Sequence, residues 1–298
     1  MPRRFLPHSD KHRGILCILI ATLSFSVMTA FSKHMVADYS VAQTTFFRYF
    51  FGLFPVLPLI ALQGGLKVFP TRHFRGHFWR AATGTLCQFL YVYAASRLPL
   101  AESISLAYTN PIFITLLSAF LLKEPIGPGL WMAVLAGFSG VLLIAEPHGM
   151  SINPGALAGV AGAMCQAVGT LGIYQLSRKD GSLSTLAWFS ILAPLLSLPF
   201  ALMDWKMPTP SDWILFALLG CAGFCGQFFM TTAYKFGTPS FLGPFNYISI
   251  LWAVLIGFVV WGDIPSLHAW LGTGIIVLAG FYIVHRERLL KRQPMAQP

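Results

Sequence analysis

The chain has 298 residues, of which 56% are hydrophobic and only 10% are charged, and its formal net charge is +10 at pH 7. A water-soluble domain of this length would not stay in solution with so few charges, so the composition excludes that class and indicates an integral membrane protein. The basic residues lie in short loops and tails rather than in a basic soluble module, so we expect no nucleic acid as a partner.

Apolar stretches long enough to cross a bilayer, which takes about 20 helical residues, recur along the chain. In order they cover residues 14–34, 41–62, 77–96, 101–122, 128–145, 155–176, 182–203, 213–234, 239–261 and 266–284. The runs are continuous and do not alternate with a period of two, so helices rather than barrel strands satisfy the backbone in lipid. The sequence therefore predicts an all-α membrane protein with ten transmembrane helices.

Basic residues are distributed unequally between the two sets of loops. If the N-terminus is cytoplasmic, sixteen Lys and Arg residues lie inside, against only Lys33, Arg97 and Lys206 outside. The positive-inside rule favours this orientation. Both termini are then cytoplasmic, which requires an even number of spans, and anionic lipid of the inner leaflet is the expected neighbour of the inner cations.

A repeat relates the two halves of the chain. Residues 79–131, moved forward by 139 positions, align with a second copy in which Gly84 matches Gly223 and Trp131 matches Trp270. Since each copy holds five predicted helices, an odd number, the second copy must be inverted in the membrane relative to the first. Transporters built from inverted repeats bind substrate near the bilayer midplane and rock one half against the other.

These observations divide the chain into two inverted five-helix repeats with short flanking segments. The predicted boundaries are a cytoplasmic tail at 1–13, a first repeat at 14–145, a periplasmic linker at 146–154, a second repeat at 155–284 and a cytoplasmic tail at 285–298. No room remains for a soluble domain.

Polar side chains at mid-span depth are candidates for substrate contact, because an unpaired polar group in lipid costs free energy. The repeat-related Gln88 and Gln227 each lie about 12 Å from one end of their helix, and so near the membrane centre. A hydrogen bond between helices is the alternative role for them. The other candidates lie on the fourth, sixth and ninth predicted helices: Tyr108, Asn110, Gln166, Thr170, Tyr174, Asn246 and Tyr247.

Arg48 is a charge well inside a predicted span, about 10 Å from its outer end. An intramembrane arginine indicates a functional site by default and can bind a substrate carboxylate or phosphate. The alternative is that its long side chain snorkels to the nearer interface. No Asp or Glu lies at mid-membrane depth, so no residue for proton coupling stands out.

Prolines within the predicted spans remove backbone hydrogen bonds and can kink a helix. They include Pro111, Pro194, Pro199 and the Gly243-Pro244 pair.

The sequence shows no motif of an enzyme. All five cysteines lie within spans and lack the spacing of a zinc site. His73 and His77 are four residues apart in an inner loop, where we expect a solvated or headgroup-facing pair rather than a metal site. A Gly-rich phosphate loop, a serine elbow and an HExxH sequence are all missing. We therefore expect no catalytic activity, no cofactor and no resident metal.

Several motifs resemble the EamA repeat of the drug/metabolite transporter superfamily. They are Leu100-Ala101-Glu102-Ser103, Asn110-Pro111, Leu122-Lys123-Glu124-Pro125 and Gly137-Phe138-Ser139-Gly140-Val141. A bacterial subgroup that includes riboflavin and S-adenosylmethionine carriers is similar at Phe25-Ser26-Val27-Met28, Arg48, Gly243-Pro244-Phe245-Asn246-Tyr247 and Trp261-Gly262-Asp263-Ile264-Pro265. The resemblance covers nearly the whole chain and implies a transporter of the bacterial inner membrane, without specifying its substrate.

The resemblance and the mixed polar and aromatic candidates favour a secondary carrier for a small polar or amphipathic metabolite. We expect an amino-acid-like or amino-acid-derived compound, moved outward by alternating access. Uptake of riboflavin or of an S-adenosylmethionine-type compound is one alternative, and a membrane scaffold subunit that transports nothing is another. The expected partners are the small-molecule substrate and membrane lipid, and the expected assembly is a monomer or a homodimer.

Overall fold

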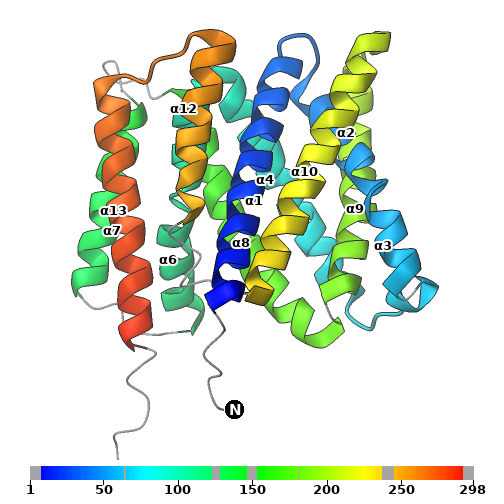
Figure 1. Ribbon diagram of the computed structural model, residues 1–298, viewed down its shortest axis with the longest axis horizontal. Coiled ribbons are helices and arrows are strands. Elements are labelled where there is room, and N and C mark those ends of the chain that lie inside the picture. Colours follow the sequence, from blue (N-terminus) through cyan, green and yellow to red (C-terminus); the bar gives the residue numbers. More distant parts are fainter. Residues whose placement is uncertain are drawn as a thin grey trace, which may run out of the picture.

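The computed structural model describes residues 8–63, 65–122, 128–145, 153–180, 182–236 and 245–290, and the regular elements in these ranges are all helical (Figure 1). The first half holds α1 (His8–Met35), α2 (Val41–Leu53), α3 (Val56–Gln63), the 3-10 turn η1 (Gly65–Val68), α4 (Phe74–Arg97), α5 (Leu100–Ala107), α6 (Asn110–Leu122) and α7 (Pro128–Ala145). The second half holds α8 (Pro154–Asp180), α9 (Ser182–Met203), α10 (Pro210–Phe236), α12 (Ile248–Trp261) and α13 (Leu267–Leu290). The predicted all-α class is confirmed.

Only some of these helices are clearly long enough to cross a membrane. Among the described residues, four helical stretches are long and apolar enough to cross a bilayer: His12–Met35, Val41–Leu62, Leu183–Met203 and Pro210–Met230. Shorter apolar helices occupy Trp131–Ala145, Ile248–Trp261 and Leu267–Ile283. The full count of ten membrane spans therefore stays a prediction.

Two of the predicted spans are interrupted. The span at 41–62 is divided into α2 and α3 at Phe54 and Pro55, and the span at 101–122 into α5 and α6 at Tyr108 and Thr109. A proline stands at or just after each break, and proline cannot donate the backbone hydrogen bond that a continuous helix requires. By contrast, α9 contains Pro194 and Pro199 and is one helix in the structure.

Some of the sequence-based expectations lie outside the described residues. They concern the Gly243-Pro244 pair, Glu124, residues 146–152 of the predicted linker, and the segments 1–7 and 291–298 of the two tails.

Figure 1 shows that α1 begins and α13 ends on the same face of the bundle, which we name the terminal face. The face on which α1 ends is named the opposite face. Extensive helix contacts join α1 with α10, α4 with α8, α7 with α13, α2 with α10, and α2 with α9. Under the shift of 139 positions, the α1–α10 pair corresponds to the α8–α4 pair. In the α7–α13 and α2–α9 pairs, the two helices that pack together are each other's repeat counterparts. The same packing arrangement therefore occurs twice, as expected for two related halves.

The α7–α13 contact depends on two glycines that bring the helix backbones together. A Cβ atom on Gly140 would lie 2.7 Å from the carbonyl oxygen of Gly272. Any side chain at residue 140 would push α7 and α13 apart, so the two helices can pack this closely only with glycine there.

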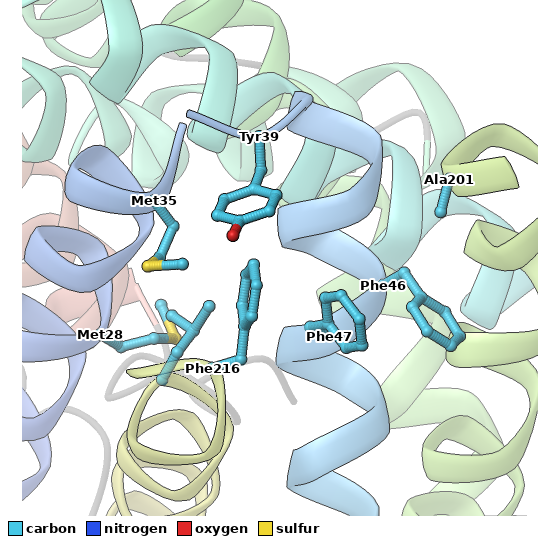
Figure 2. Packing of buried hydrophobic residues seen from close by; sticks show 8 residues of the cluster. Met28, Met35, Tyr39, Phe46, Phe47, Ala201 and Phe216 are labelled. Atoms are coloured by element: carbon cyan, nitrogen blue, oxygen red, sulfur yellow. The ribbon is translucent and has the colours of Figure 1, made fainter. Parts of the chain in front are cut away.

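A cluster of aromatic and methionine side chains fills the space between α1, α2, α9 and α10 near the opposite face (Figure 2). Its buried members are Met28, Met35, Tyr39, Phe46, Phe47, Ala201, Phe216 and Leu219. The rings of Phe47 and Phe216 are 4.4 Å apart between centroids. Because α1 and α2 belong to the first half and α9 and α10 to the second, this cluster joins the two halves.

Candidate functional site

The clearest candidate site lies where a helix is interrupted in each half. Helix α5 ends at Ala107, and the Leu106 carbonyl near this end accepts hydrogen bonds from both the backbone N–H of Thr109, at 3.1 Å, and the Thr109 hydroxyl, at 2.7 Å. In the second half, Tyr247 precedes the first residue of α12. Tyr108 and Tyr247 are repeat-related, 139 positions apart. Corresponding helix breaks in the two halves of a transporter indicate where its substrate binds.

The structure brings these two tyrosines together. Their ring centroids are 4.8 Å apart with an interplanar angle of 37°. The Tyr108 hydroxyl donates to the backbone carbonyl of Asn246 at 2.5 Å and also forms a hydrogen bond with the Ser249 hydroxyl. Since the phenol proton is directed to the carbonyl, the serine hydroxyl acts as the donor to the phenol oxygen. One tyrosine of the first half thereby fixes the start of α12 in the second half.

Helices α1 and α13 complete the surroundings of the tyrosine pair. Tyr247 stacks on Phe281 of α13, with 5.0 Å between ring centroids. A Cβ atom on Gly280 would collide with the Tyr247 hydroxyl, so the space for this ring exists only because residue 280 is glycine. From α1, the buried Ser26 hydroxyl donates to the carbonyl of Ser249 at 3.1 Å.

One polar atom in this site has no hydrogen-bond partner among the described residues. The side-chain oxygen of Asn246 is buried and accepts no hydrogen bond from the described residues. A buried acceptor without a donor costs about 1–3 kcal/mol. A ligand that carries an N–H or O–H group would remove that cost by donating to Asn246. Asn110, at the first position of α6, is half-buried.

The two glutamines do not share one environment. Gln88 is buried in α4, with 7% of its surface exposed, whereas the Gln227 side chain in α10 is exposed. Their helices nevertheless pack against repeat-related partners, α4 against α8 and α10 against α1. Repeat symmetry in the sequence therefore does not produce equivalent positions for these amides, and a role for them in substrate contact stays a prediction.

The predicted stripe on α8 is anchored to α4. The Tyr91 hydroxyl donates to the side-chain oxygen of Gln166 at 2.5 Å. Thr170 donates to the backbone carbonyl of Gln166 at 2.8 Å, within the same helix. Both Gln166 and Thr170 are exposed, while the Tyr174 side chain lies outside the described set. Tyr91 was not among the sequence candidates, although it lies one turn after Gln88.

Arg48 is directed into the bundle. Its Nε atom contacts the sulfur of Met28 at 3.0 Å, and its guanidinium lies 4.7 Å from the centroid of the Tyr49 ring. A Cβ atom on Gly223 of α10 would lie 3.5 Å from the same Nε atom. These neighbours on α1 and α10 do not fit a side chain that snorkels to the nearer interface. Arg48 therefore contributes a positive charge between the two halves.

A second arginine, which the sequence did not single out, occupies a similar position in α4. Arg80 donates from Nη1 to the Thr185 carbonyl at 2.6 Å, and its guanidinium lies 4.5 Å from the centroid of the Phe189 ring. Both partners belong to α9. One sequence signal could have identified it. The repeat-related residue is Leu219, so the arginine is a charge at a position where the other half has an apolar side chain.

At the terminal face, Asp180 at the end of α8 joins the first turn of α4. Its carboxylate accepts from the Thr71 hydroxyl at 2.6 Å, from His73 Nδ1 at 3.0 Å and from His77 Nε2 at 2.8 Å. The Thr71 and histidine hydrogen bonds lower the pKa of Asp180 to about 2. His77 is part of α4 and 1% exposed, so the expectation of a solvated or headgroup-facing histidine pair is wrong for this residue. The physical reason is that the helix turns His77 inward, onto a carboxylate.

No described group of three or more His, Cys, Asp or Glu side chains has the arrangement needed to hold a metal ion. The described part of the chain offers hydrogen-bonding, aromatic and cationic groups at the interface of the two halves. Such groups can bind an organic molecule in a defined orientation.

Comparisons with known proteins agree with this architecture. The family model described as the EamA-like transporter family matches residues 12–145 and 153–285. A solved crystal structure with 21% sequence identity has a TM-score of 0.59, and the alignment covers 95% of this chain and 99% of that one. At that identity the likeness concerns the fold alone.

Similar curated proteins are transporters by name. The chain is 29% identical over 292 residues to the riboflavin transporter of Vibrio cholerae serotype O1, covering 96% of this chain and 98% of the relative. It is 29% identical to the pseudopaline exporter CntI of Pseudomonas aeruginosa, with coverages of 89% and 94%. It is 24% identical to the S-adenosylmethionine uptake transporter of Rickettsia prowazekii, with coverages of 92% and 93%. With both halves matched by the family model, the chain belongs to the EamA-like transporter family.

Proposed function

We propose that this protein is a secondary carrier of the bacterial inner membrane that moves a small organic metabolite by alternating access. In this proposal ten spanning helices form two inverted repeats, and the substrate binds at Tyr108 and Tyr247, between the halves. The observation that carries the proposal is the contact between these two tyrosines, each at a helix break of its own half. Because the two tyrosines belong to different halves, any movement of one half against the other changes their contact.

The chemistry of the site favours a substrate with both hydrogen-bonding groups and an apolar face. The Asn246 side-chain oxygen calls for a donor, and the rings of Tyr247 and Phe281 offer an aromatic surface. Elsewhere at the interface of the two halves, Arg48 offers a cation that can attract a carboxylate. An amino-acid-derived compound carries all three features, and we propose that it moves outward.

Riboflavin uptake is the second candidate. The stacked pair of Tyr247 and Phe281 would suit a flat ring system, and one relative with nearly full coverage is named a riboflavin transporter. The two candidates differ in direction and in net charge of the substrate, so one experiment can separate them.

The test uses proteoliposomes with the full-length protein and labelled amino acids or riboflavin on either side. Tyr108→Phe and Tyr247→Ala should each lower flux of the true substrate by about tenfold, equivalent to about 1.4 kcal/mol. Tyr282→Phe changes an exposed tyrosine of α13 and serves as the control. Elution as a single symmetric peak in size-exclusion chromatography shows that the variants are folded.

Two results would contradict the proposal. Unchanged flux in folded Tyr108→Phe and Tyr247→Ala variants would remove the tyrosine pair from the substrate path. Absence of flux for every metabolite that accumulates or disappears in a deletion strain would favour the membrane scaffold instead. A comparison of metabolites inside and outside such a strain selects the compounds to test.

A further inference from the structure

A second site lies away from the tyrosine pair, at the terminal face. A cavity of about 580 Å³ opens between the first turns of α4 and the last turns of α8. Its lining includes the cations Arg72, Arg75, Arg80 and Lys179, and no acidic side chain is among its described lining residues. The sequence explains its basic character, since these cations belong to the excess that predicts a cytoplasmic face.

The nearby carboxylate does not neutralise these charges. Asp180 adjoins Lys179, but its two oxygens already accept hydrogen bonds from Thr71, His73 and His77. Within the described ranges, Arg72, Arg75 and Lys179 form no ion pair with an acidic side chain, and all three are exposed. The Nε atom of Arg80 is buried and has no hydrogen-bond partner among the described residues. The cavity is therefore suited to an anion.

Apart from Thr83, the lining of the cavity beyond its basic residues is apolar. Trp79 lies at its rim with 67% of its surface exposed, and Val168 lines it from α8. Exposed Leu86 continues this surface along α4, about 10 Å further from the terminal face, and exposed Met164 continues it along α8. A basic end joined to a long apolar wall matches a molecule with an anionic head and a hydrocarbon chain.

We propose that this cavity binds an anionic phospholipid of the adjoining leaflet. The phosphate is held by Arg72, Arg75 and Lys179, and an acyl chain covers Trp79, Val168 and Leu86. Guanidinium groups bind phosphate oxygens through paired hydrogen bonds, and cations near an anionic membrane surface attract its lipids. Free phosphate shares the headgroup chemistry but leaves the apolar wall uncovered.

The test is native mass spectrometry of the full chain in detergent micelles, with phosphatidylglycerol, phosphatidylcholine or inorganic phosphate added. Wild-type protein should retain phosphatidylglycerol in preference to phosphatidylcholine. The double substitution Arg72→Gln and Lys179→Gln should lower the retained fraction by about tenfold or more, because two cations are lost. Lys67→Gln with Lys206→Gln removes the same charge from exposed positions outside the cavity and should retain lipid as wild type does.

A third variant tests the apolar wall. Val168→Asp introduces a carboxylate where the acyl chain is expected, and should weaken lipid retention while the basic residues stay in place. Equal retention in the cavity and control double variants would overturn the proposal. So would displacement of phosphatidylglycerol by inorganic phosphate at equal concentration, because the ligand would then be a soluble phosphate.

Discussion

At the opposite face, α10 directs Phe216 and Leu219 against α1 and α2, inside a cluster of aromatic and methionine side chains. At the terminal face, α4 directs His77 and Arg80 against α8 and α9, toward a carboxylate and a backbone carbonyl. These pairs are repeat-related, because 139 positions separate His77 from Phe216 and Arg80 from Leu219. At these repeat-related positions, one packing arrangement thus has apolar contacts at one end and polar contacts at the other.

This difference indicates how much free energy is needed to separate the helices at each face. Separating the helices at the opposite face would expose the aromatic cluster to water, at about 25 cal/mol per Å² of apolar surface. At the terminal face, water can replace the hydrogen bonds of Asp180, so each bond to this charged group contributes only about 1.5–3 kcal/mol net. If the halves rock as proposed, we expect the terminal face to open at a lower cost in free energy.

The largest expected effect comes from Phe216→Ala. Phe216 is fully buried and contacts Phe47 and Tyr39. Removing a buried aromatic ring leaves a cavity and costs about 3–5 kcal/mol. Thermal unfolding in detergent should show a markedly lower midpoint for this variant. His77→Ala, at the repeat-related position, is the matched comparison, and an equally large decrease there would contradict the difference between the two ends.

Asp180→Asn should have the next largest effect. The substitution removes a charge that receives three hydrogen bonds, from Thr71, His73 and His77, and places an amide N–H₂ against one of these donors. Hydrogen bonds to a charged group contribute about 1.5–3 kcal/mol. The unfolding midpoint should fall by less than in Phe216→Ala. Lys179→Gln changes the neighbouring exposed charge and should leave the midpoint near that of wild type.

The contribution of Asp180 should also depend on pH in a defined direction. Its folded-state pKa, about 2, is lowered by hydrogen bonds from Thr71, His73 and His77. An unfolded aspartate has a pKa of about 3.9, so the stabilisation by the carboxylate is complete above that value and is lost as pH falls toward about 2. The gap in midpoint between wild type and Asp180→Asn should narrow between pH 4 and pH 2.5. A gap that is already closed at pH 5 would contradict this assignment.

The smallest expected effect concerns the Lys33–Asp263 ion pair at the opposite face. Its charged atoms are 2.8 Å apart, and the side chains are 16% and 30% exposed. Partly exposed pairs of this kind contribute about 0–1 kcal/mol, less at high salt. A double-mutant cycle with Lys33→Met and Asp263→Asn measures the coupling directly. A coupling as large as the effect of Phe216→Ala would show that the opposite face is not closed mainly by apolar packing.

The helices could be predicted from the sequence because their signals are local. Apolar runs of membrane length fall on helices in the described residues, with interruptions in the runs at 41–62 and 101–122, and Pro111 indicates the break that separates α5 from α6. The pattern did not predict that Pro194 and Pro199 leave α9 in one piece. Neighbouring helices decide whether the freed carbonyls are tolerated, and a single segment carries no information about its neighbours.

The candidate site was only partly predictable. Tyr108 and Tyr247 stand out because they are repeat-related, yet their mutual contact depends on the space at Gly280, on another helix. Tyr91, Arg80 and Asp180 carry no motif, and their importance arises from partners 75 to 109 residues away in the sequence. Such contacts depend on the rotation of each helix about its axis, which residue spacing does not fix.

The sequence by itself determined the all-helical class, the repeat and its offset, and the family, because hydropathy and residue order are properties of the chain. The tertiary structure alone decided that repeat-related positions have different environments. Gln88 is buried and Gln227 is exposed, and His77 contacts a carboxylate whereas Phe216 contacts aromatic rings. The physical reason is that a repeat fixes which helices meet, whereas burial, charge and hydrogen bonding depend on the side chains that meet there.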